Sequence, residues 1–165
     1  MKRILILFAA LYAFGVAGQT SVQQVTDKAR QVKSEMRTKM VGESLKYDGS
    51  KITYYEVKES EILKEFEVTL FLRDNYTLYF NGNASSVNHK VSMKIYDQPY
   101  DYPNRKALFS KDNISGTELK VSTIDLNKKY QELNKTSEKL KSIFVEYTVP
   151  GGSQDLGGIV LIFGY

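Results

Sequence analysis

The sequence predicts a mainly β protein, an antiparallel jelly-roll-like β-sandwich preceded by one amphipathic N-terminal helix. Three observations support this fold class. Segments of alternating apolar and polar residues recur at roughly eight-to-twelve-residue spacing, with turn-forming residues between them. The chain has 12 Tyr and 8 Phe but only 3 Pro, and aromatic rings pack well on pleated sheets. With 165 residues, 42% of them hydrophobic, it has the size of one domain and can bury a real core.

Residues 1–18 have the features of a secretory signal peptide. Lys2 and Arg3 precede an apolar run from Ile4 to Phe14, and small residues follow up to Gly18. The run is about half of the ~20 residues that a membrane-spanning helix needs, so we expect cleavage and no stable membrane anchor. Exported eukaryotic domains of this size commonly contain disulfides, and this chain has no Cys. The sequence therefore favours a bacterial protein located in the periplasm or outside the cell.

The charge of the chain argues against a nucleic-acid partner. The formal net charge is +4, and removal of Lys2 and Arg3 with the signal peptide lowers it to 4 − 2 = +2. No stripe of Lys and Arg interleaved with aromatic residues is present. With one His and no Cys, the chain lacks the usual ligands for zinc or copper, and we expect no metal and no cofactor.

Residues 19–42 predict an amphipathic helix. Ser21 and Gln24 form a capping-box pattern, and Gly42 stands where a helix would end. The apolar residues that share one face of this helix are Val22, Val25, Ala29, Val32, Met36 and Met40. This face could pack on the sandwich or bind a partner, and the sequence leaves both open.

Residues 43–165 are expected to form the sandwich, organised around a β-hairpin at 66–80. In this stretch, apolar residues alternate from Phe66 to Leu72 and again from Tyr76 to Phe80. A second hairpin is predicted from Leu45 to Tyr55 with its turn at Asp48-Gly49. Residues 58–66 fit either a helical turn or the start of a strand.

Further strands are predicted along the rest of the chain. The first contains Val91, Met93 and Ile95, the second is 107–110, and the third is 117–126. In the third, the apolar residues change from one face of the strand to the other, and a bulge near Ser122 to Ile124 would explain this change. Residues 127–141 are polar and predict a loop with a helical turn. Two strands are predicted at the end of the sequence. One face of the first carries Ile143, Val145, Tyr147 and Val149, and one face of the second carries Ile159, Leu161, Phe163 and Tyr165.

The order of these motifs resembles secreted bacterial β-sandwich domains of the pre-peptidase C-terminal type, including stand-alone relatives. The stretches that carry the resemblance are Leu72, Tyr76 to Phe80, Val91 to Asp97, Ile143 to Tyr147 and Gly157 to Leu161. The resemblance implies a non-catalytic accessory or adhesive module and transfers no site residue.

No catalytic pattern stands out. A Ser-His-Asp triad would have to use His89, the one His, and no Ser lies in a GxSxG motif. We therefore expect His89 to be exposed and without a role, and we expect no enzyme. A hydrolase that uses paired carboxylates is a distant alternative, because no two carboxylates are marked out. Calcium binding by loop carboxylates such as Asp97 or Asp112 is open.

The most site-like stretch is a tyrosine-rich loop. Its candidate binding residues are Tyr96, Tyr100, Asp101, Tyr102, Asn104 and Arg105. Tyr and Arg are enriched at protein interfaces, and tyrosine rings can also stack on sugars. The alternative is that these rings cover the edge of the core with their hydroxyls outward. The sequence thus predicts a module for protein binding or envelope structure, with a glycan-binding module that uses residues 96–105 as the alternative, and a protein or a cell-surface glycan as the partner.

Overall fold

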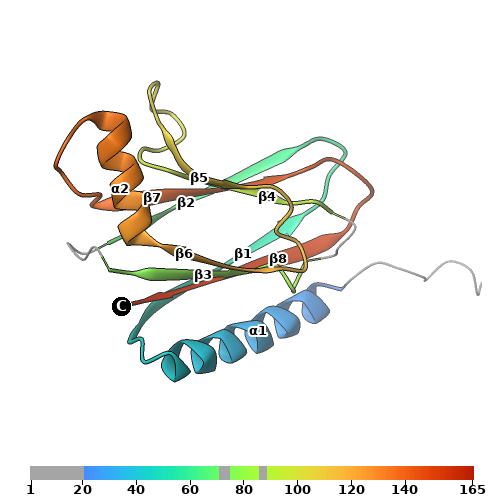
Figure 1. Cartoon of the computed structure of the whole chain (residues 1–165). Helices are drawn as coiled ribbons and strands as arrows, with labels where there is room; N and C mark the ends of the chain where they lie inside the picture. Colours follow the sequence, from blue (N-terminus) through green and yellow to red (C-terminus); the bar gives the residue numbers. More distant parts are fainter. Residues whose placement is uncertain (1–20, 71–74, 86–88) are drawn as a thin grey trace, which may run out of the picture.

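The computed structural model describes residues 21–70, 75–85 and 89–165, so the signal peptide predicted at 1–18 lies outside the described residues. The described residues form mostly β-structure with two helices (Figure 1). The elements are α1 (Val22–Gly42), β1 (Tyr47–Glu56), β2 (Ile62–Thr69), β3 (Thr77–Asn81), β4 (Ser92–Tyr96), β5 (Ala107–Lys111), β6 (Glu118–Ser122), α2 (Thr123–Asn134), β7 (Ser142–Val149) and β8 (Leu156–Gly164).

The strands form two antiparallel four-stranded sheets, which confirms the mainly β, sandwich-like fold. Their orders are β1-β8-β3-β6 and β2-β7-β4-β5. Every strand pair is antiparallel. The main core lies between the sheets, where the predicted inward residues Ile143, Val145, Ile159 and Leu161 are fully buried.

Helix α1 packs on the outer face of the β1-β8-β3-β6 sheet (Figure 1). Ser21 caps it with the predicted capping box, in which the Ser21 hydroxyl accepts from Gln24 N–H. The apolar stripe contacts Val160 and Ile162 of β8, so this strand is buried on both faces. A strand that contacts core on both sides needs an almost continuous apolar run, as in the sequence of β8. The stripe therefore packs on the sheet, except Val22, whose side chain is exposed.

The predicted hairpin at 66–80 is wrong. Strand β2 belongs to one sheet and β3 to the other. Phe66 and Val68 of β2 and Leu78 and Phe80 of β3 contribute to the same core from opposite sides. The alternation of apolar and polar residues shows which face of a strand is buried. It does not distinguish two strands that pair within one sheet from two strands that face each other across a sandwich.

The hairpin predicted at 45–55 is also wrong, because Asp48-Gly49 lies within the single strand β1. The pairing of β1 with β8 changes register between Tyr47 and Gly49, which marks a β-bulge. The Asp48 carboxylate accepts a 2.7 Å bond from the Tyr76 hydroxyl. A Cβ at Gly49 would lie 2.5 Å from the Phe163 ring, so glycine allows this ring to approach the bulge.

A helix, not a bulge, explains the change of face near Ser122. Strand β6 ends at Ser122, and the Ser122 hydroxyl caps α2 by accepting from Ile124 N–H at 3.2 Å. Leu126 of α2 is buried, whereas Ile124 is 59% exposed. The predicted loop at 127–141 thus contains most of a helix that lies at one end of the sheets (Figure 1). Of the segment 58–66, for which helix and strand were both open, residues 62–66 belong to β2.

Candidate functional site

The structure brings three of the six predicted binding residues into one internal network. The Arg105 guanidinium lies 3.8 Å from the Tyr96 ring centroid and 4.9 Å from the Tyr100 ring centroid. It donates to Glu65 of β2 at 2.9 Å and to Glu146 of β7 at 2.6 Å. Tyr100 N–H donates to the other Glu65 oxygen at 2.9 Å. We call these five residues the Arg105 cluster.

The Arg105 cluster is largely shielded from water. The Arg105 side chain is 16% exposed, and that of Glu146 is 4% exposed. Burial by itself lowers the pKa of Arg105, but the hydrogen bond and the charge of Glu146 outweigh it and raise the pKa above its ordinary value. The Arg105 guanidinium thus donates to two carboxylates and lies close to two aromatic rings. The cluster therefore fixes the tyrosine-rich loop on the sheet.

The other predicted residues of the loop lie at the surface. Asp101, Tyr102 and Asn104 are exposed, with Tyr102 at 50%. Tyr100 is 62% exposed even though its backbone and one ring contact belong to the cluster. Exposed tyrosine area is thus present at this loop, but the arginine predicted to serve a partner is used within the fold.

The expectation that His89 is exposed is wrong. Its side chain is 13% exposed, and its Nε2 atom lies 3.2 Å from the Asp155 carboxylate. The second oxygen of Asp155 accepts from Leu156 N–H at 2.8 Å. The Ser115 hydroxyl donates to the backbone carbonyl of His89, not to its ring. The His89–Asp155 pair thus joins the segment before β4 to the segment before β8.

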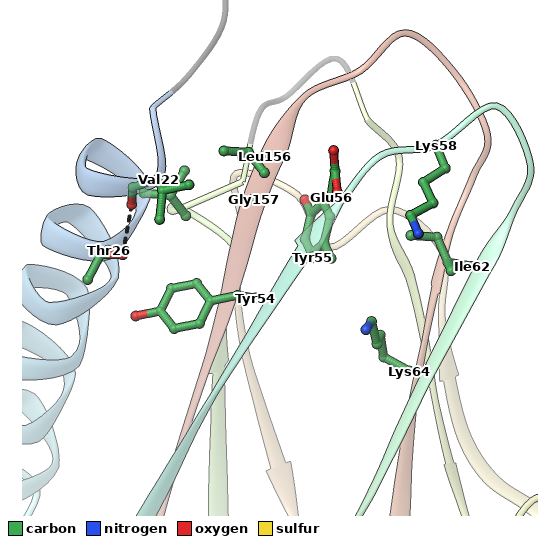
Figure 2. Close-up of a pocket in the computed structure, with 11 residues that line it drawn as sticks. Val22, Thr26, Tyr54, Tyr55, Glu56, Lys58, Ile62, Lys64, Leu156 and Gly157 are labelled. Carbon is green, nitrogen blue, oxygen red and sulfur yellow. Dashed lines mark hydrogen bonds between the residues drawn. The ribbon is translucent and has the colours of Figure 1, made fainter.

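A groove lies at the edge of β1, next to α1 and β2. It has a volume of about 410 Å³, within the roughly 300–1,000 Å³ range of small-molecule sites. Figure 2 shows Val22 and Thr26 of α1 on one side of β1 and Ile62 and Lys64 of β2 on the other. The lining residues are Val22, Val25, Thr26, Tyr54, Tyr55, Glu56, Lys58, Ile62, Lys64, Leu156 and Gly157. We call this site the β1 edge groove.

Two adjacent tyrosines of β1 give the groove its shape. Tyr54 faces α1, whereas Tyr55 is buried in the core between the sheets, as alternation along a strand requires. A Cβ at Gly157 would lie 2.3 Å from the Tyr55 ring. Glycine at this position therefore lets the Tyr55 ring lie against β8.

The pattern of hydrogen bonds around β8 shows which backbone groups of β1 face away from β8 and toward the free edge. Gly158 of β8 donates to Ala84 O at 3.1 Å and accepts from the Ser85 hydroxyl at 2.9 Å, so both of its backbone groups point away from β1. Tyr54 pairs with Gly158 and must belong to a non-hydrogen-bonded pair, whose groups point outward. Along β1 and just beyond it, residues alternate between facing β8 and facing away from it. Val57 lies three residues after Tyr54 and should therefore face β8, and its N–H does donate to Asp155 O.

It follows that Ile52, Tyr54 and Glu56 direct their backbone N–H and C=O groups to the free edge of β1. Among the strands that the structure describes, β1 has β8 as its one neighbour. The edge is flanked by apolar surface, since Val22 is 69% exposed and Tyr54 is 45% exposed. Such an arrangement can pair with an added strand and receive its side chains.

Sequence reasoning missed this groove because it divided β1 into two strands. The signal that could have found it is the pair Tyr54-Tyr55, which places one large ring on each face of a strand. Asp97, considered for calcium, accepts from Lys106 N–H at 2.6 Å and is used within the loop. Within 21–70, 75–85 and 89–165, no group of three or more Asp, Glu, His or Cys side chains is arranged to hold a metal ion. In the same ranges, no helix is long and apolar enough to cross a membrane.

Comparison with known proteins places the chain in no family. No protein-family model matches it, and neither does any curated protein. Among solved structures, the chain is similar to the crystal structure of the Yersinia pseudotuberculosis-derived mitogen, with 9% sequence identity and a TM-score of 0.38. The match covers 70% of this chain and 85% of that chain. A likeness at this level does not bear on function.

Proposed function

We propose that the chain is an exported, non-catalytic binding module that takes an extended segment of a protein partner at the β1 edge groove. One observation carries the proposal: the unpaired edge of β1 directs the backbone groups of Tyr54 and Glu56 into an open, largely apolar groove. In strand addition, main-chain hydrogen bonds supply affinity, and pockets for alternate side chains supply specificity. The groove offers both.

A comparison of the edge strands supports the choice of β1. The two sheets end in β1 and β6, and in β2 and β5. Strands β5 and β6 have 5 residues each, whereas β1 has 10. The outer residues of β2 include Glu65 and Glu67, and charges on an edge strand disfavour pairing. Strand β1 thus has the longest edge and lies beside apolar surface.

The test compares two substitutions at Tyr54. Tyr54→Ala removes the ring and keeps the outward N–H, whereas Tyr54→Pro removes both. Because the Tyr54 N–H points away from β8, proline at this edge position breaks no bond of the β1–β8 ladder. The baits are the wild type, both Tyr54 variants and Tyr100→Ala, applied to envelope extracts of the organism that encodes the chain. Captured proteins are identified by mass spectrometry.

We expect one protein to bind the wild type and Tyr100→Ala, to bind Tyr54→Ala more weakly, and to be lost with Tyr54→Pro. Circular dichroism checks that all baits are folded. Equal capture of the partner by Tyr54→Pro and Tyr54→Ala would contradict strand addition at this edge. Loss of capture with Tyr100→Ala alone would move the binding surface to the tyrosine-rich loop.

A second candidate function is glycan binding at the tyrosine-rich loop. The observation that favours it is the exposure of Tyr100 and Tyr102, at 62% and 50%, because exposed rings can stack on sugar faces. A glycan array with the wild type, Tyr100→Ala and Tyr102→Ala tests it. Sugar binding that both substitutions abolish would support this function, and an array without signal would reject it.

Export to the periplasm or exterior, and the relationship to pre-peptidase C-terminal domains, remain proposals. The segment 1–18 has the composition of a signal peptide. The mass of the mature protein in a periplasmic or culture fraction tests export. A mass that corresponds to cleavage near Gly18 is expected, and a full-length protein in the cytoplasm would contradict it.

A further inference from the structure

The charges around the β1 edge groove are mainly positive. Lys58 and Lys64 line it, together with one carboxylate, Glu56. Glu56 is engaged by the Gln154 side-chain amide, which donates to it at 2.8 Å. Within the described parts of the chain, neither Lys58 nor Lys64 forms an ion pair. Glu59 and Glu61, in the loop between β1 and β2, do not line the groove.

The two sides of the groove differ in chemistry. On the α1 side lie Val22, Val25 and the Tyr54 ring. On the β2 side lie Ile62 and Lys64. They are on the same face of β2 as Phe66 and Val68, which point toward the core. Figure 2 shows the Lys58 side chain near the end of β1 that leads toward β2. One side is therefore apolar, and the other is cationic with an apolar member.

A strand added to β1 would continue its sheet, so its successive side chains would point alternately to these two sides. Side chains directed to α1 would contact apolar groups, and those directed to β2 would lie near ammonium groups. Opposite charges across such an interface raise the rate of association and select the partner.

Resting on the function proposed above, we infer that the groove selects an extended segment in which apolar residues alternate with acidic ones. The apolar residues contact Val22, Val25 and Tyr54, and the carboxylates pair with Lys58 and Lys64. The occupant is thus an extended segment of a partner protein that is apolar on one face and anionic on the other.

The experiment uses two capped peptides of equal length, one of alternating valine and glutamate and one of alternating valine and lysine. Their affinities are measured by calorimetry at low salt. The proteins are the mature wild type, the double variant Lys58→Glu/Lys64→Glu, and the double variant Lys128→Glu/Lys129→Glu. The last changes the net charge equally but alters exposed residues of α2, so it controls for long-range electrostatics.

We expect the glutamate peptide to bind the wild type and the α2 variant alike, and to bind the groove variant roughly tenfold more weakly, as two exposed ion pairs would give. The lysine peptide should show the reverse preference. Equal binding of both peptides to the wild type, an equal effect of the two double variants, or no binding of the glutamate peptide would overturn the inference.

The Tyr54 variants distinguish an error in the proposed charge selection from an error in the proposed strand addition at β1. If both peptides bind equally but Tyr54→Pro abolishes binding while Tyr54→Ala retains part of it, strand addition at β1 stands and charge selection is wrong. If peptide binding is insensitive to Tyr54→Pro, and partner capture is too, the proposed function itself is wrong.

Discussion

The Arg105 cluster and the β1 edge groove are both built from tyrosine and charged side chains, but they differ in how completely their groups are paired. In the cluster, Arg105 bonds to two carboxylates and lies close to two aromatic rings. In the groove, Lys58 and Lys64 have no ion-pair partner among the described residues, and three backbone positions of β1 face an open edge. The comparison teaches that composition alone does not separate a site that binds a partner from one that holds the fold.

The largest expected effect is the loss of stability on removal of Arg105. Arg105→Ala leaves the buried Glu146 carboxylate without its charged donor. Removing one partner of a buried ion pair costs about 3–5 kcal/mol, so we expect the free energy of unfolding to fall by about 3 kcal/mol, measured by denaturant titration. A loss below about 1 kcal/mol would show that the cluster is not structural, because it would then be no costlier than an exposed pair.

A smaller effect of opposite sign is expected at Tyr147, next to Glu146 on β7 but facing the core. Its hydroxyl is fully buried and has no hydrogen-bond partner among the described residues, and burial raises the pKa of this hydroxyl strongly. Tyr147→Phe removes an unsatisfied polar group and keeps the ring near Phe66. We expect a stabilisation of about 1 kcal/mol, with the exposed Tyr102→Phe unchanged. A clear destabilisation by Tyr147→Phe would mean that the hydroxyl is satisfied.

An exposed ion network near the end of α1 should give a smaller, pH-dependent effect. The Lys120 ammonium donates to Glu43 at 2.6 Å and the Tyr79 hydroxyl donates to it at 2.5 Å. The bond from Lys120, then that from Tyr79, lowers the pKa of Glu43 below its ordinary 4.5. The ionised network therefore contributes stability above that pH and loses it as the pH falls through the folded-state pKa.

Unfolding of the wild type and of Glu43→Gln across this range measures the effect. The wild type should be more stable at neutral pH, and the difference should shrink as the pH falls below 4.5. A difference that is independent of pH would contradict the assignment to the Glu43 carboxylate.

The smallest effect on stability is expected in the groove itself. Lys64→Ala removes an exposed side chain without an ion pair in the described structure, so the free energy of unfolding should change by no more than about 0.5 kcal/mol. Binding of the glutamate peptide should weaken in the same variant. A large loss of stability would place Lys64 with the Arg105 cluster among structural residues.

The sequence was sufficient for the parts of the fold that depend on local periodicity. The α1 stripe with its Ser21 cap and the inward faces of β4, β7 and β8 followed from residue spacing. Pairing did not follow, because alternation identifies a buried face and not a neighbour. Asp48-Gly49 fits both a turn and a bulge, and the contact with Phe163 that decides between them is distant in sequence.

The candidate site shows the same limit. The tyrosine-rich loop was visible in the sequence, but the partners of Arg105 are on β2 and β7, about 40 residues away along the chain in each direction. The groove combines α1, β1, β2 and β8, so it exists only once the two sheets and the helix are assembled. The pair Tyr54-Tyr55 could have indicated a strand with a large ring on each face, but which neighbours this strand has depends on the assembled sheets.

Amide hydrogen exchange along β1, measured by NMR, tests the central claim most directly. If Ile52, Tyr54 and Glu56 direct their N–H groups to an open edge, these amides exchange fast in the free protein, whereas those of Thr53 and Tyr55, which face β8, exchange slowly. Addition of the glutamate peptide should then slow the exchange of these outward amides and leave that of Thr53 and Tyr55 unchanged. Slow exchange at Tyr54 in the free protein, equal to that of Tyr55, would contradict the account.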